Sequence, residues 1–386
     1  MIDSLGIANY RSLQDLTTRM GSLNVVTGPN GAGKSNFYKA LRLLAACAQG
    51  SVVNALAREG GLQSTLWAGP ESTTAAQRRG EAPVQGTVRQ QVLRLKLGFA
   101  GETFGYCISL GLPVPSQTLF NRDPVIKREV IYAGPYYRAA KALVDRDGPV
   151  VKVRDGRSWT VVEQHLPLHD SLFARLSDPA ATPEVTQLKH EIQQWRFYDH
   201  FRTDSDAPAR QQRLGTRTPV LAANGEDLAA ALQSIAEMGD RGELDAAVDD
   251  AFPGCRVDVT VDDGNRFGVL FQQEGLLRPL SGAELSDGTL RYLLWIAALL
   301  TPRPPPLIVL NEPETSLHPD LLPALGRLII AASEHSQVWV ISHAGRLVNV
   351  LERDERCTSI HLEKVLGATT VHGQGLLDRP NWYWPD

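Results

Sequence analysis

The chain has 386 residues, which at roughly 100–200 residues per domain predicts two domains or one large domain with an insertion. Hydrophobic residues make up 43% and charged residues 21%, so a sizeable core is expected and global disorder is excluded. The formal net charge of −4 excludes a uniformly basic polymer binder, although not a local basic patch. There is no apolar run of about 18 residues, no secretory leader pattern and no closely spaced cysteine pair, so we expect a cytoplasmic protein without a membrane partner.

The first part of the chain predicts a strand, a helix and then antiparallel β structure. A short apolar run at residues 22–26 precedes a glycine-rich stretch, after which apolar residues recur at helical spacing over residues 34–48. Apolar and polar residues alternate on both sides of a turn over residues 93–110, and again over residues 150–162. This alternation predicts two antiparallel hairpins.

The remainder predicts a mainly helical middle followed by an α/β segment. Helical patterns dominate residues 163–250, and residues 257–271 read as a further hairpin. Continuous apolar runs at residues 307–310 and 338–341 are typical of strands that are buried on both faces. Predicted helices over residues 286–300 and 321–332 alternate with these strands.

A phosphate-binding pattern lies between the first predicted strand and helix. Residues 28–35 read Gly-Pro-Asn-Gly-Ala-Gly-Lys-Ser and match G-x-x-x-x-G-K-[ST]. Glycines let backbone N–H groups fold around phosphate oxygens, and the helix N-terminus adds its dipole. Lys34 is expected to reach the β- and γ-phosphates, and the Ser35 hydroxyl to bind Mg²⁺. The residues predicted to bind the nucleotide here are Asn30, Gly31, Ala32, Gly33, Lys34, Ser35 and Asn36.

Two polar residues follow the apolar run at 307–310. P-loop ATPases have an acid at the position of Asn311 that holds the water shell of Mg²⁺, so an uncharged amide predicts an electrostatically weaker metal site. Glu312 comes next and is predicted to polarise the attacking water as a general base. A plain acid in a turn is the alternative for Glu312, and Glu314 is interpreted as structural.

A serine and a glycine open the helix predicted at 286–300. Ser286 is a good N-cap and Asp287 suits the positive end of the helix dipole, so a plain cap is one interpretation. In the other interpretation, the helix amides, the serine hydroxyl and the close backbone of Gly288 grip a γ-phosphate. A similar sequence lies just upstream at residues 280–284, and we prefer Ser286 because the helix begins there.

Taken together, these motifs resemble the ABC-type ATPases of the RecF/SMC class, and within them the bacterial RecF-like "predicted ATPase" group of AAA proteins. In that class a partner subunit donates the signature motif, so that ATP joins two heads. Residues 285–289 match this motif, with Asp287 in place of the usual first glycine. Residues 315–320 resemble the D-loop, His343 resembles the switch histidine that senses the γ-phosphate, and Arg11 lies in a segment that would place it near the nucleotide.

The resemblance implies an α/β fold: a P-loop NTPase with an ABC-type head, which has a mixed central sheet, an antiparallel β subdomain and an inserted helical lobe. We expect one split head over residues 1–386. Lobe I would comprise residues 1–160 and 255–386, and the helical lobe residues 161–254, with the signature helix at 285–300 packing near it.

The resemblance also implies ATP and Mg²⁺ as cofactors, slow ATP hydrolysis and homodimerisation on ATP binding. The output would be DNA repair, recombination or phage defence, with DNA or an effector protein as a further partner. Catalysis would then involve Lys34, Glu312 and His343. Nucleotide binding would add Arg11, Ser286, Asp287 and Gly288, and Mg²⁺ would be held through Ser35 and Asn311.

Three rival functions stay open from the sequence. Asn311 favours a non-hydrolysing, ATP-gated scaffold or clamp for a partner protein. A transporter ATPase would need a membrane partner, and the long β-containing insertion disfavours it. A nuclease would need a further domain, and we expect the residues after His343 to be too few to form one.

Arginines and aromatic residues alternate over residues 195–218, which is the usual combination for binding nucleic acid. A solvated helix face with buried rings is the open alternative. The arginines are Arg196, Arg202, Arg210, Arg213 and Arg217. The aromatic residues at 382–384 are expected to pack on the body of the protein.

Overall fold

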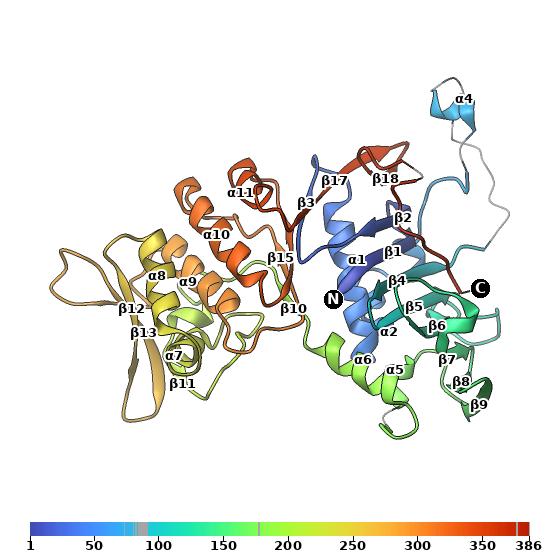
Figure 1. The fold of residues 1–386 in the computed structure, drawn as a ribbon, viewed down its shortest axis with the longest axis horizontal. Coiled ribbons are helices and arrows are strands. Elements are labelled where there is room, and N and C mark those ends of the chain that lie inside the picture. The colour runs from blue at the N-terminus through green and yellow to red at the C-terminus, as the bar shows by residue number, and fades with distance from the viewer. Residues whose placement is uncertain are drawn as a thin grey trace. The chain divides into compact units, whose positions relative to one another are not determined.

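The computed structural model in Figure 1 describes residues 1–72, 74–79, 81, 83, 92–176, 178–375 and 377–385. It divides into two compact units, which are described separately. Unit 1 comprises Met1–Met20, Thr27–Gln194 and Ile360–Asp386, and unit 2 comprises Gly21–Val26 and Trp195–Ser359. The predicted helical lobe at 161–254 coincides with neither unit, because residues 161–194 lie in unit 1 and residues 195–254 in unit 2. The assignment of lobes stays a prediction.

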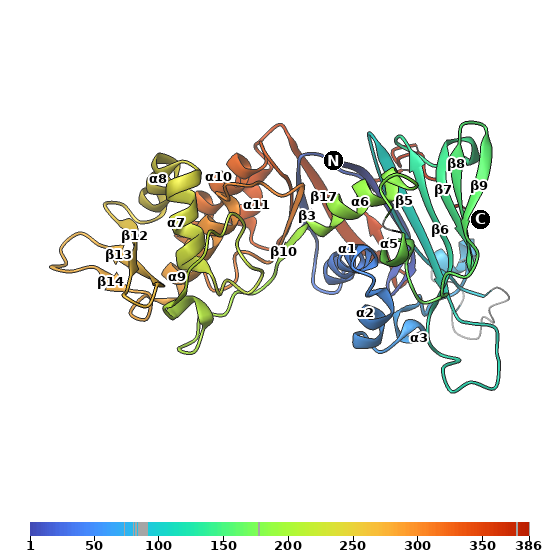
Figure 2. The same cartoon turned by 90° about the horizontal axis from the view of Figure 1, so that it is seen from below.

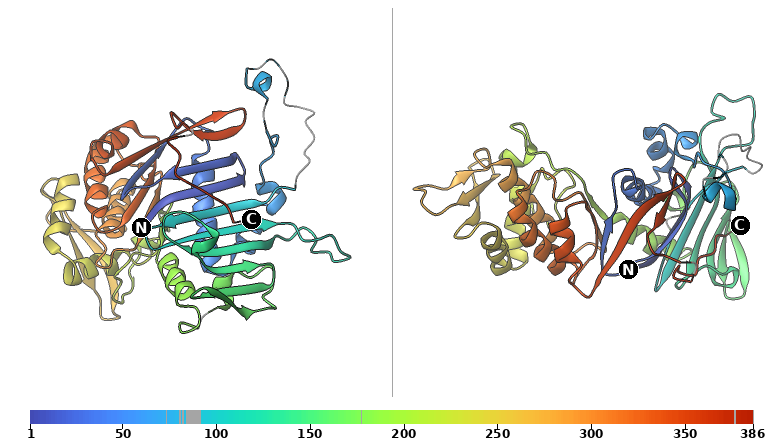
Figure 3. Two further views of the ribbon diagram at one scale, coloured as in Figure 1. Left: turned by 45° about the vertical axis from the view of Figure 1, so that its right-hand side comes forward. Right: turned by 90° about the horizontal axis from the view of Figure 1, so that it is seen from above.

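Unit 1 is built on an eight-stranded antiparallel sheet of order β2-β1-β4-β5-β6-β7-β8-β9. Figure 3 shows these strands side by side in its left view. The two hairpins predicted at residues 93–110 and 150–162 are confirmed as β4–β5 and β8–β9. The strands are β1 (Ile2–Tyr10), β2 (Leu13–Arg19), β4 (Leu95–Gly101), β5 (Phe104–Gly111), β6 (Val125–Ala133), β7 (Ala142–Asp147), β8 (Val150–Asp155) and β9 (Ser158–Glu163).

Helices cover one face of this sheet, as Figure 2 shows. The predicted helix at 34–48 is confirmed as α1 (Lys34–Ala48), which contacts β1 and β4. It also packs on α2 (Val52–Arg58), α5 (Leu172–Arg175) and α6 (Pro183–Gln193). Three short elements complete this part of the chain: α3 (Leu62–Thr65), α4 (Ala75–Arg78) and η1 (Ala139–Lys141).

The C-terminal part of unit 1 returns to the sheet. The hairpin of β17 (Cys357–Val365) and β18 (Ala368–Val371) contacts β2 through β18. Trp382 then lies so close to Gly6 that a Cβ added there would come within 2.2 Å of the indole ring. Trp382 and Trp384 pack on a buried cluster that includes Tyr132, which confirms the predicted docking of this aromatic segment.

Unit 2 contains four parallel strands in the order β10-β15-β16-β3. They are β10 (Arg196–Tyr198), β15 (Leu307–Asn311), β16 (Gln337–Ile341) and β3 (Leu23–Thr27). The buried strands predicted at 307–310 and 338–341 are thereby confirmed. Because the carboxyl ends of parallel strands meet at one edge, the residues that follow β10, β15 and β16 gather there.

The other elements of unit 2 enclose a large apolar core beside these strands. Its helices are α7 (Leu228–Met238), α8 (Arg241–Ala251), α9 (Asp287–Leu299), α10 (Leu322–Ala332) and α11 (Gly345–Leu351), with the short turns η2 (Pro208–Arg210) and η3 (Pro319–Leu321). A small antiparallel sheet adds β11 (Arg213–Leu214), β12 (Arg256–Val261), β13 (Arg266–Gln272) and β14 (Leu280–Ser281).

One part of the predicted helical middle is wrong. Between α6 and α7 the chain runs through β10, η2, β11 and loops rather than helices. Pro208 and Pro219 interrupt any helix in this stretch, because proline lacks the backbone N–H that a helix needs. None of the helices in the described part of the chain combines the length and apolar character that a membrane span requires.

Candidate functional site

The phosphate loop, residues 28–35, joins β3 to α1. Gly28, Gly31 and Gly33 have φ angles of 143°, 80° and 114°, in a region that side chains rarely adopt. A Cβ added to Gly33 would also lie 2.2 Å from the Thr369 hydroxyl. Gly33 is the N-cap of α1 and has no side chain with which to cap it, so the first turn of the helix lacks a side-chain cap.

Lys34 lies across this loop. Its ammonium donates hydrogen bonds to the carbonyl oxygens of Gly28, at 2.7 Å, and Pro29, at 3.3 Å, and the residue is only 7% exposed. A buried ammonium among carbonyl dipoles is held over the loop rather than extended into solvent. The cation is therefore held beside the backbone of the phosphate loop.

The side chains of Thr369, Ser12 and Asn36 brace the phosphate loop. The sequence analysis did not identify Thr369. The Thr369 hydroxyl donates to the carbonyl of Ala32 at 2.7 Å and lies 2.7 Å from the Ser12 hydroxyl. Asn36, which the motif predicts to bind nucleotide, donates its amide to the same Ser12 hydroxyl at 2.9 Å. Thr369 and Ala32 are 337 residues apart in sequence, so no local pattern could have joined them.

Arg11 lies in unit 1, one residue before Ser12. Its guanidinium pairs with Glu59 at 2.9 Å, and the Tyr10 hydroxyl donates to the same carboxylate at 2.6 Å. Burial and the Glu59 charge raise the pKa of the Tyr10 hydroxyl well above its ordinary value. The proposed nucleotide contact of Arg11 stays a prediction.

The edge of the parallel strands in unit 2 gathers the second group of predicted residues. Asn311 ends β15, and its amide donates to a carboxylate oxygen of Asp199 at 3.2 Å. Glu312 follows with a φ of 50° and a side chain that is 45% exposed. These residues line a cavity of about 340 Å³ together with His200, Phe201, Arg291, Trp295, Pro313 and Thr315.

His343 lies at the same edge, after β16. Its Nδ1 atom is 3.9 Å from Glu312 Oε1 and 3.2 Å from Glu314 Oε1. The buried Glu314 carboxylate also accepts hydrogen bonds from the Ser342 hydroxyl and from the backbone N–H groups of His343 and Ala344. Glu314 thus fixes the loop that presents His343, which agrees with the structural role predicted for it.

The helix predicted from Ser286 begins where expected. Ser286 is the N-cap of α9, and its hydroxyl accepts a hydrogen bond from the backbone N–H of Thr289 at 3.1 Å. The upstream Ser281 instead lies in β14 and donates to Glu284, whose pKa is lowered to about 2 by Arg278 and these serine hydrogen bonds. The upstream serine therefore does not open a helix.

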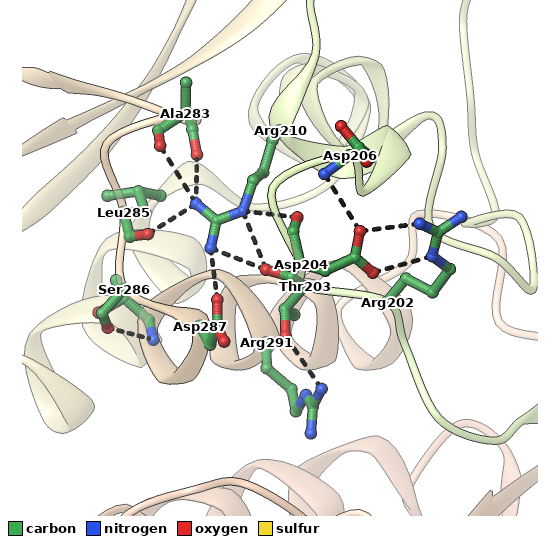
Figure 4. A network of polar contacts seen from close by, with 12 residues as sticks. Arg202, Thr203, Asp204, Asp206, Arg210, Ala283, Leu285, Ser286, Asp287 and Arg291 are labelled. Carbon is green, nitrogen blue, oxygen red and sulfur yellow. Dashed lines mark hydrogen bonds and ion pairs between the residues drawn. The ribbon is translucent and has the colours of Figure 1, made fainter.

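Arg210 contacts the turn before α9 through several hydrogen bonds, as Figure 4 shows. Its side chain is 9% exposed and pairs with Asp287 at 2.6 Å, whereas the Asp287 side chain is 63% exposed. The guanidinium also donates to the carbonyl oxygens of Thr203, Asp204, Gly282, Ala283 and Leu285. One arginine therefore ties the loop after β10 to the serine-glycine turn.

Arg291 makes a second tie from within α9. It is 3% exposed and donates to the carbonyls of Thr315, at 2.6 Å, and Phe201, at 3.0 Å, and to the Thr203 hydroxyl, at 3.1 Å. Burial lowers the pKa of its guanidinium from the ordinary value. The helix is thereby joined to the predicted D-loop and to the same loop that Arg210 holds.

Part of the prediction that the arginines of residues 195–218 bind nucleic acid is wrong. The Arg210 side chain is only 9% exposed and is occupied by the contacts described above, so it does not present a cation at the surface. Arg202 pairs with Asp204 at 2.8 Å, and Arg213 pairs with Glu226 at 2.9 Å. DNA binding by the remaining arginines stays a prediction.

Comparison with known proteins places these features in context. The family model described as "AAA domain, putative AbiEii toxin, Type IV TA system" matches residues 23–128 and 163–345. No curated protein matches the chain.

Among solved structures, an SMC head bound to the C-winged helix domain of ScpA aligns with a TM-score of 0.51 at 11% identity, covering 97% of this chain and 98% of that chain. An SMC head domain from Thermotoga maritima aligns with a TM-score of 0.47 at 13% identity, covering 97% of this chain and 99% of that chain. The first alignment shows the fold of an SMC head, and the predicted fold class is confirmed.

Proposed function

The chain belongs to the family of AAA domains whose description names the AbiEii toxin of type IV toxin–antitoxin systems, and from this premise we propose that it binds and hydrolyses ATP. The observation that carries the proposal is the edge of the parallel strands in unit 2. There Glu312 follows β15 and His343 follows β16, and the distance from His343 Nδ1 to Glu312 Oε1 is 3.9 Å. The strand on the other side of β16 is β3, which leads into the phosphate loop. In the proposed site the carboxylate suits activation of the attacking water, and the histidine suits stabilisation of charge on the γ-phosphate.

In the proposed reaction the phosphate loop binds the triphosphate through the backbone of residues 30–36, and Lys34 neutralises charge on the β- and γ-phosphates. Glu312 orients and polarises the attacking water, and His343 stabilises the charge that develops on the γ-phosphate. Ser35 and Asn311 would hold Mg²⁺, which suits them because that ion prefers oxygen ligands. When bound, Mg²⁺ supplies further neutralisation of the phosphate oxygens.

We further propose that ATP joins two copies of the chain. Ser286, Asp287 and Gly288 of one copy would contact the γ-phosphate held by the other, since α9 presents its N-terminus at this turn. The contact between Arg291 and Thr315 would then link the signature helix to the D-loop within each copy. Among the roles in DNA repair, recombination and phage defence, the toxin–antitoxin wording of the family's description favours defence.

The test is the rate of phosphate release and the oligomeric state of the wild type, measured with and without DNA. We expect turnover in the wild type that is lost in Glu312→Gln, while Glu312→Gln accumulates as an ATP-bound dimer. Glu355→Gln, which alters an exposed acid, is the matched control and should behave as the wild type does. A wild type that neither hydrolyses ATP nor dimerises on it would contradict the proposal.

Ser286→Arg separates the dimer contact from nucleotide binding. The added side chain should prevent ATP-driven dimerisation, while the affinity of the monomer for ATP stays close to that of the wild type. Loss of both properties would show that Ser286 acts within its own copy or supports the fold.

The second candidate function is a non-hydrolysing, ATP-gated clamp, and Asn311 is the observation that favours it. An uncharged residue at this position weakens the hold on the metal's water shell, so engagement without turnover is the expected behaviour of such a protein. ATP-dependent dimerisation with no phosphate release above that of Glu312→Gln would establish the clamp.

A further inference from the structure

Unit 2 contains another cavity, formed by residues that the proposed ATP site does not use. The helices α8, α9 and α10 contact one another, as Figure 1 also shows. These three helices and the loops that follow α9 and α10 line a cavity of about 640 Å³. Small-molecule sites have volumes of about 300–1,000 Å³, so the cavity is large enough for a small organic ligand.

The inner part of this cavity is apolar. Leu299, Ala324, Leu328 and Ala332 line it and are buried in the protein. A ligand with an apolar body would remove further apolar surface from water here, which favours binding. The lining therefore selects for a molecule with an apolar part.

Tyr292 adds a polar group to the lining. The residue is only 1% exposed, and its ring packs edge-on against Phe252. Its hydroxyl makes no hydrogen bond to another residue in the described part of the chain. Burial raises the pKa of Tyr292, so the hydroxyl stays protonated at neutral pH. A buried hydroxyl without a partner favours a ligand that can form a hydrogen bond with it.

Two of the four acids that line the cavity are paired with arginines. Asp250 accepts two hydrogen bonds from Arg327, at 2.7 and 2.9 Å, and this pair joins α8 to α10. Glu334 lies 3.2 Å from a guanidinium nitrogen of Arg356. Because of these pairs, Asp250 and Glu334 add little net charge to the cavity.

The other two acids, Asp240 and Glu243, give the cavity its surplus negative charge. Both line it at the start of α8, and neither forms an ion pair within the part of the chain that the structure describes. Asp240 accepts hydrogen bonds from the backbone N–H groups of Gly242 and Glu243, which cap the helix and leave the charge in place. With His335 counted as neutral, the lining favours a cation.

We propose that this cavity binds a small organic cation, in which a compact apolar body carries a protonated amine. The amine would donate a hydrogen bond to the Tyr292 hydroxyl, and the carboxylates of Asp240 and Glu243 would balance its charge. All of these residues belong to unit 2. The inference is independent of ATP binding, so it can hold or fail separately from the proposed function.

The test uses three probes that share one rigid apolar body and differ in charge: 1-adamantanamine, 1-adamantanecarboxylate and 1-adamantanemethanol. Their affinities for the full chain without nucleotide are measured by ligand-observed NMR at neutral pH. The amine should bind at least about 10-fold more tightly than the carboxylate, because the surplus acids attract the first and repel the second. Equal affinities would overturn the proposal, as would no binding of the amine at about 10 mM, since even inefficient ligands of this size bind near that concentration.

A variant that fills the cavity tests where the probes bind. Ala331 lines the cavity and is exposed, so Ala331→Trp should occupy its opening without disturbing the core. The affinity for the amine and the alcohol should fall by about 10-fold or more. Ala181→Trp, at an exposed alanine of unit 1, is the control and should bind both probes as the wild type does. Unchanged binding of the amine by Ala331→Trp would overturn the proposal.

A charge variant tests why the amine is preferred. Asp240→Asn combined with Glu243→Gln keeps a residue that can cap α8 and removes both surplus charges. The preference for the amine over the carboxylate should fall below about 3-fold, while the affinity for the alcohol stays the same. Asp263→Asn combined with Glu355→Gln removes the same charge from two exposed acids outside the lining and is the matched control. A preference that persists in the first double variant would overturn the proposal.

The hydroxyl is tested by Tyr292→Phe, which keeps the ring and its packing. The affinity for the amine should fall by about 5-fold, the size expected for one hydrogen bond. The midpoint of urea unfolding should not fall, because the hydroxyl has no partner within the described chain. Unchanged affinity for the amine would overturn the assigned hydrogen bond, and a lower midpoint would show that the hydroxyl serves the fold instead.

Discussion

Two helix N-termini in this molecule are candidates for binding the same triphosphate, and the chain builds them in opposite ways. α1 begins after Gly33, a residue without a side chain, and its fully described first turn contains no acid. α9 begins after Ser286, which caps the helix with its own hydroxyl, and Asp287 occupies its first turn. The N-terminus of α1 has no side-chain cap, and contacts behind the loop position it. The N-terminus of α9 has its Thr289 amide capped by the Ser286 hydroxyl.

The difference between the two N-termini predicts how each would bind a phosphate. An open N-terminus offers its first amides to a ligand without first breaking a side-chain cap. A capped N-terminus must exchange its serine hydroxyl bond for the ligand, and the Asp287 charge would repel phosphate unless Arg210 balances it. The phosphate loop is therefore expected to set affinity, and the serine-glycine turn to respond to a phosphate that is already bound.

The largest effect should come from removing the cation of the open terminus. Lys34→Ala is expected to lower the affinity for ATP by about 100-fold or more, since charge-assisted hydrogen bonds to phosphate are among the strongest. Equilibrium binding of a fluorescent ATP analogue measures this, with Lys39→Ala in the same helix as the control. Unchanged affinity in Lys34→Ala would contradict the assignment of the phosphate loop to ATP binding.

The next effect concerns the support beneath the capped terminus. Arg210→Gln should lower the free energy of unfolding by about 3 kcal/mol, because several carbonyls around it lose a buried charged donor. Asp287→Asn should cost less than about 1 kcal/mol, since the Asp287 side chain is largely exposed. Urea denaturation checks both values, and equal losses would show that the carbonyl contacts contribute little.

Removing the brace behind the open terminus should have a smaller effect on stability. Thr369→Val keeps the shape of the side chain but leaves the Ala32 carbonyl without this donor, at a cost of about 1–2 kcal/mol. Because the brace positions the loop, the affinity for ATP should fall as well. A loss of stability with unchanged ATP affinity would show that the loop keeps its shape without Thr369.

Removing the serine cap itself should have a smaller effect than removing the brace. Ser286→Ala removes an N-cap hydrogen bond and should cost about 1 kcal/mol in the free energy of unfolding. Ser286→Asp, which caps equally well, should restore this stability while weakening ATP-driven dimerisation through charge repulsion. Dimerisation of Ser286→Asp at the wild-type level would argue that the turn does not face a phosphate.

The sequence predicted the features whose parts are close together in the chain. The phosphate loop, the buried strand before Glu312 and the start of α9 are each formed by fewer than about 15 consecutive residues, over which periodicity and capping rules act. Thr369 and Arg210 were not predicted in their observed roles, and neither was the contact of Asp199 with Asn311. Each acts on a segment far away in sequence, across a hairpin, a parallel strand pair or a loop contact, and no local pattern marks such a partner. Arg210 shows the difficulty best, because its neighbours in sequence suggested a nucleic-acid surface that its burial contradicts.

The backbone at Glu312 has a consequence for engineering. A φ of 50° is uncommon for a residue with a long side chain and costs about 1–2 kcal/mol relative to glycine, while asparagine tolerates it better than most. A library selected only for heat tolerance should therefore accumulate glycine or asparagine at position 312. Such variants would gain stability by discarding the proposed general base, so a thermostability screen of this protein needs a simultaneous selection for turnover.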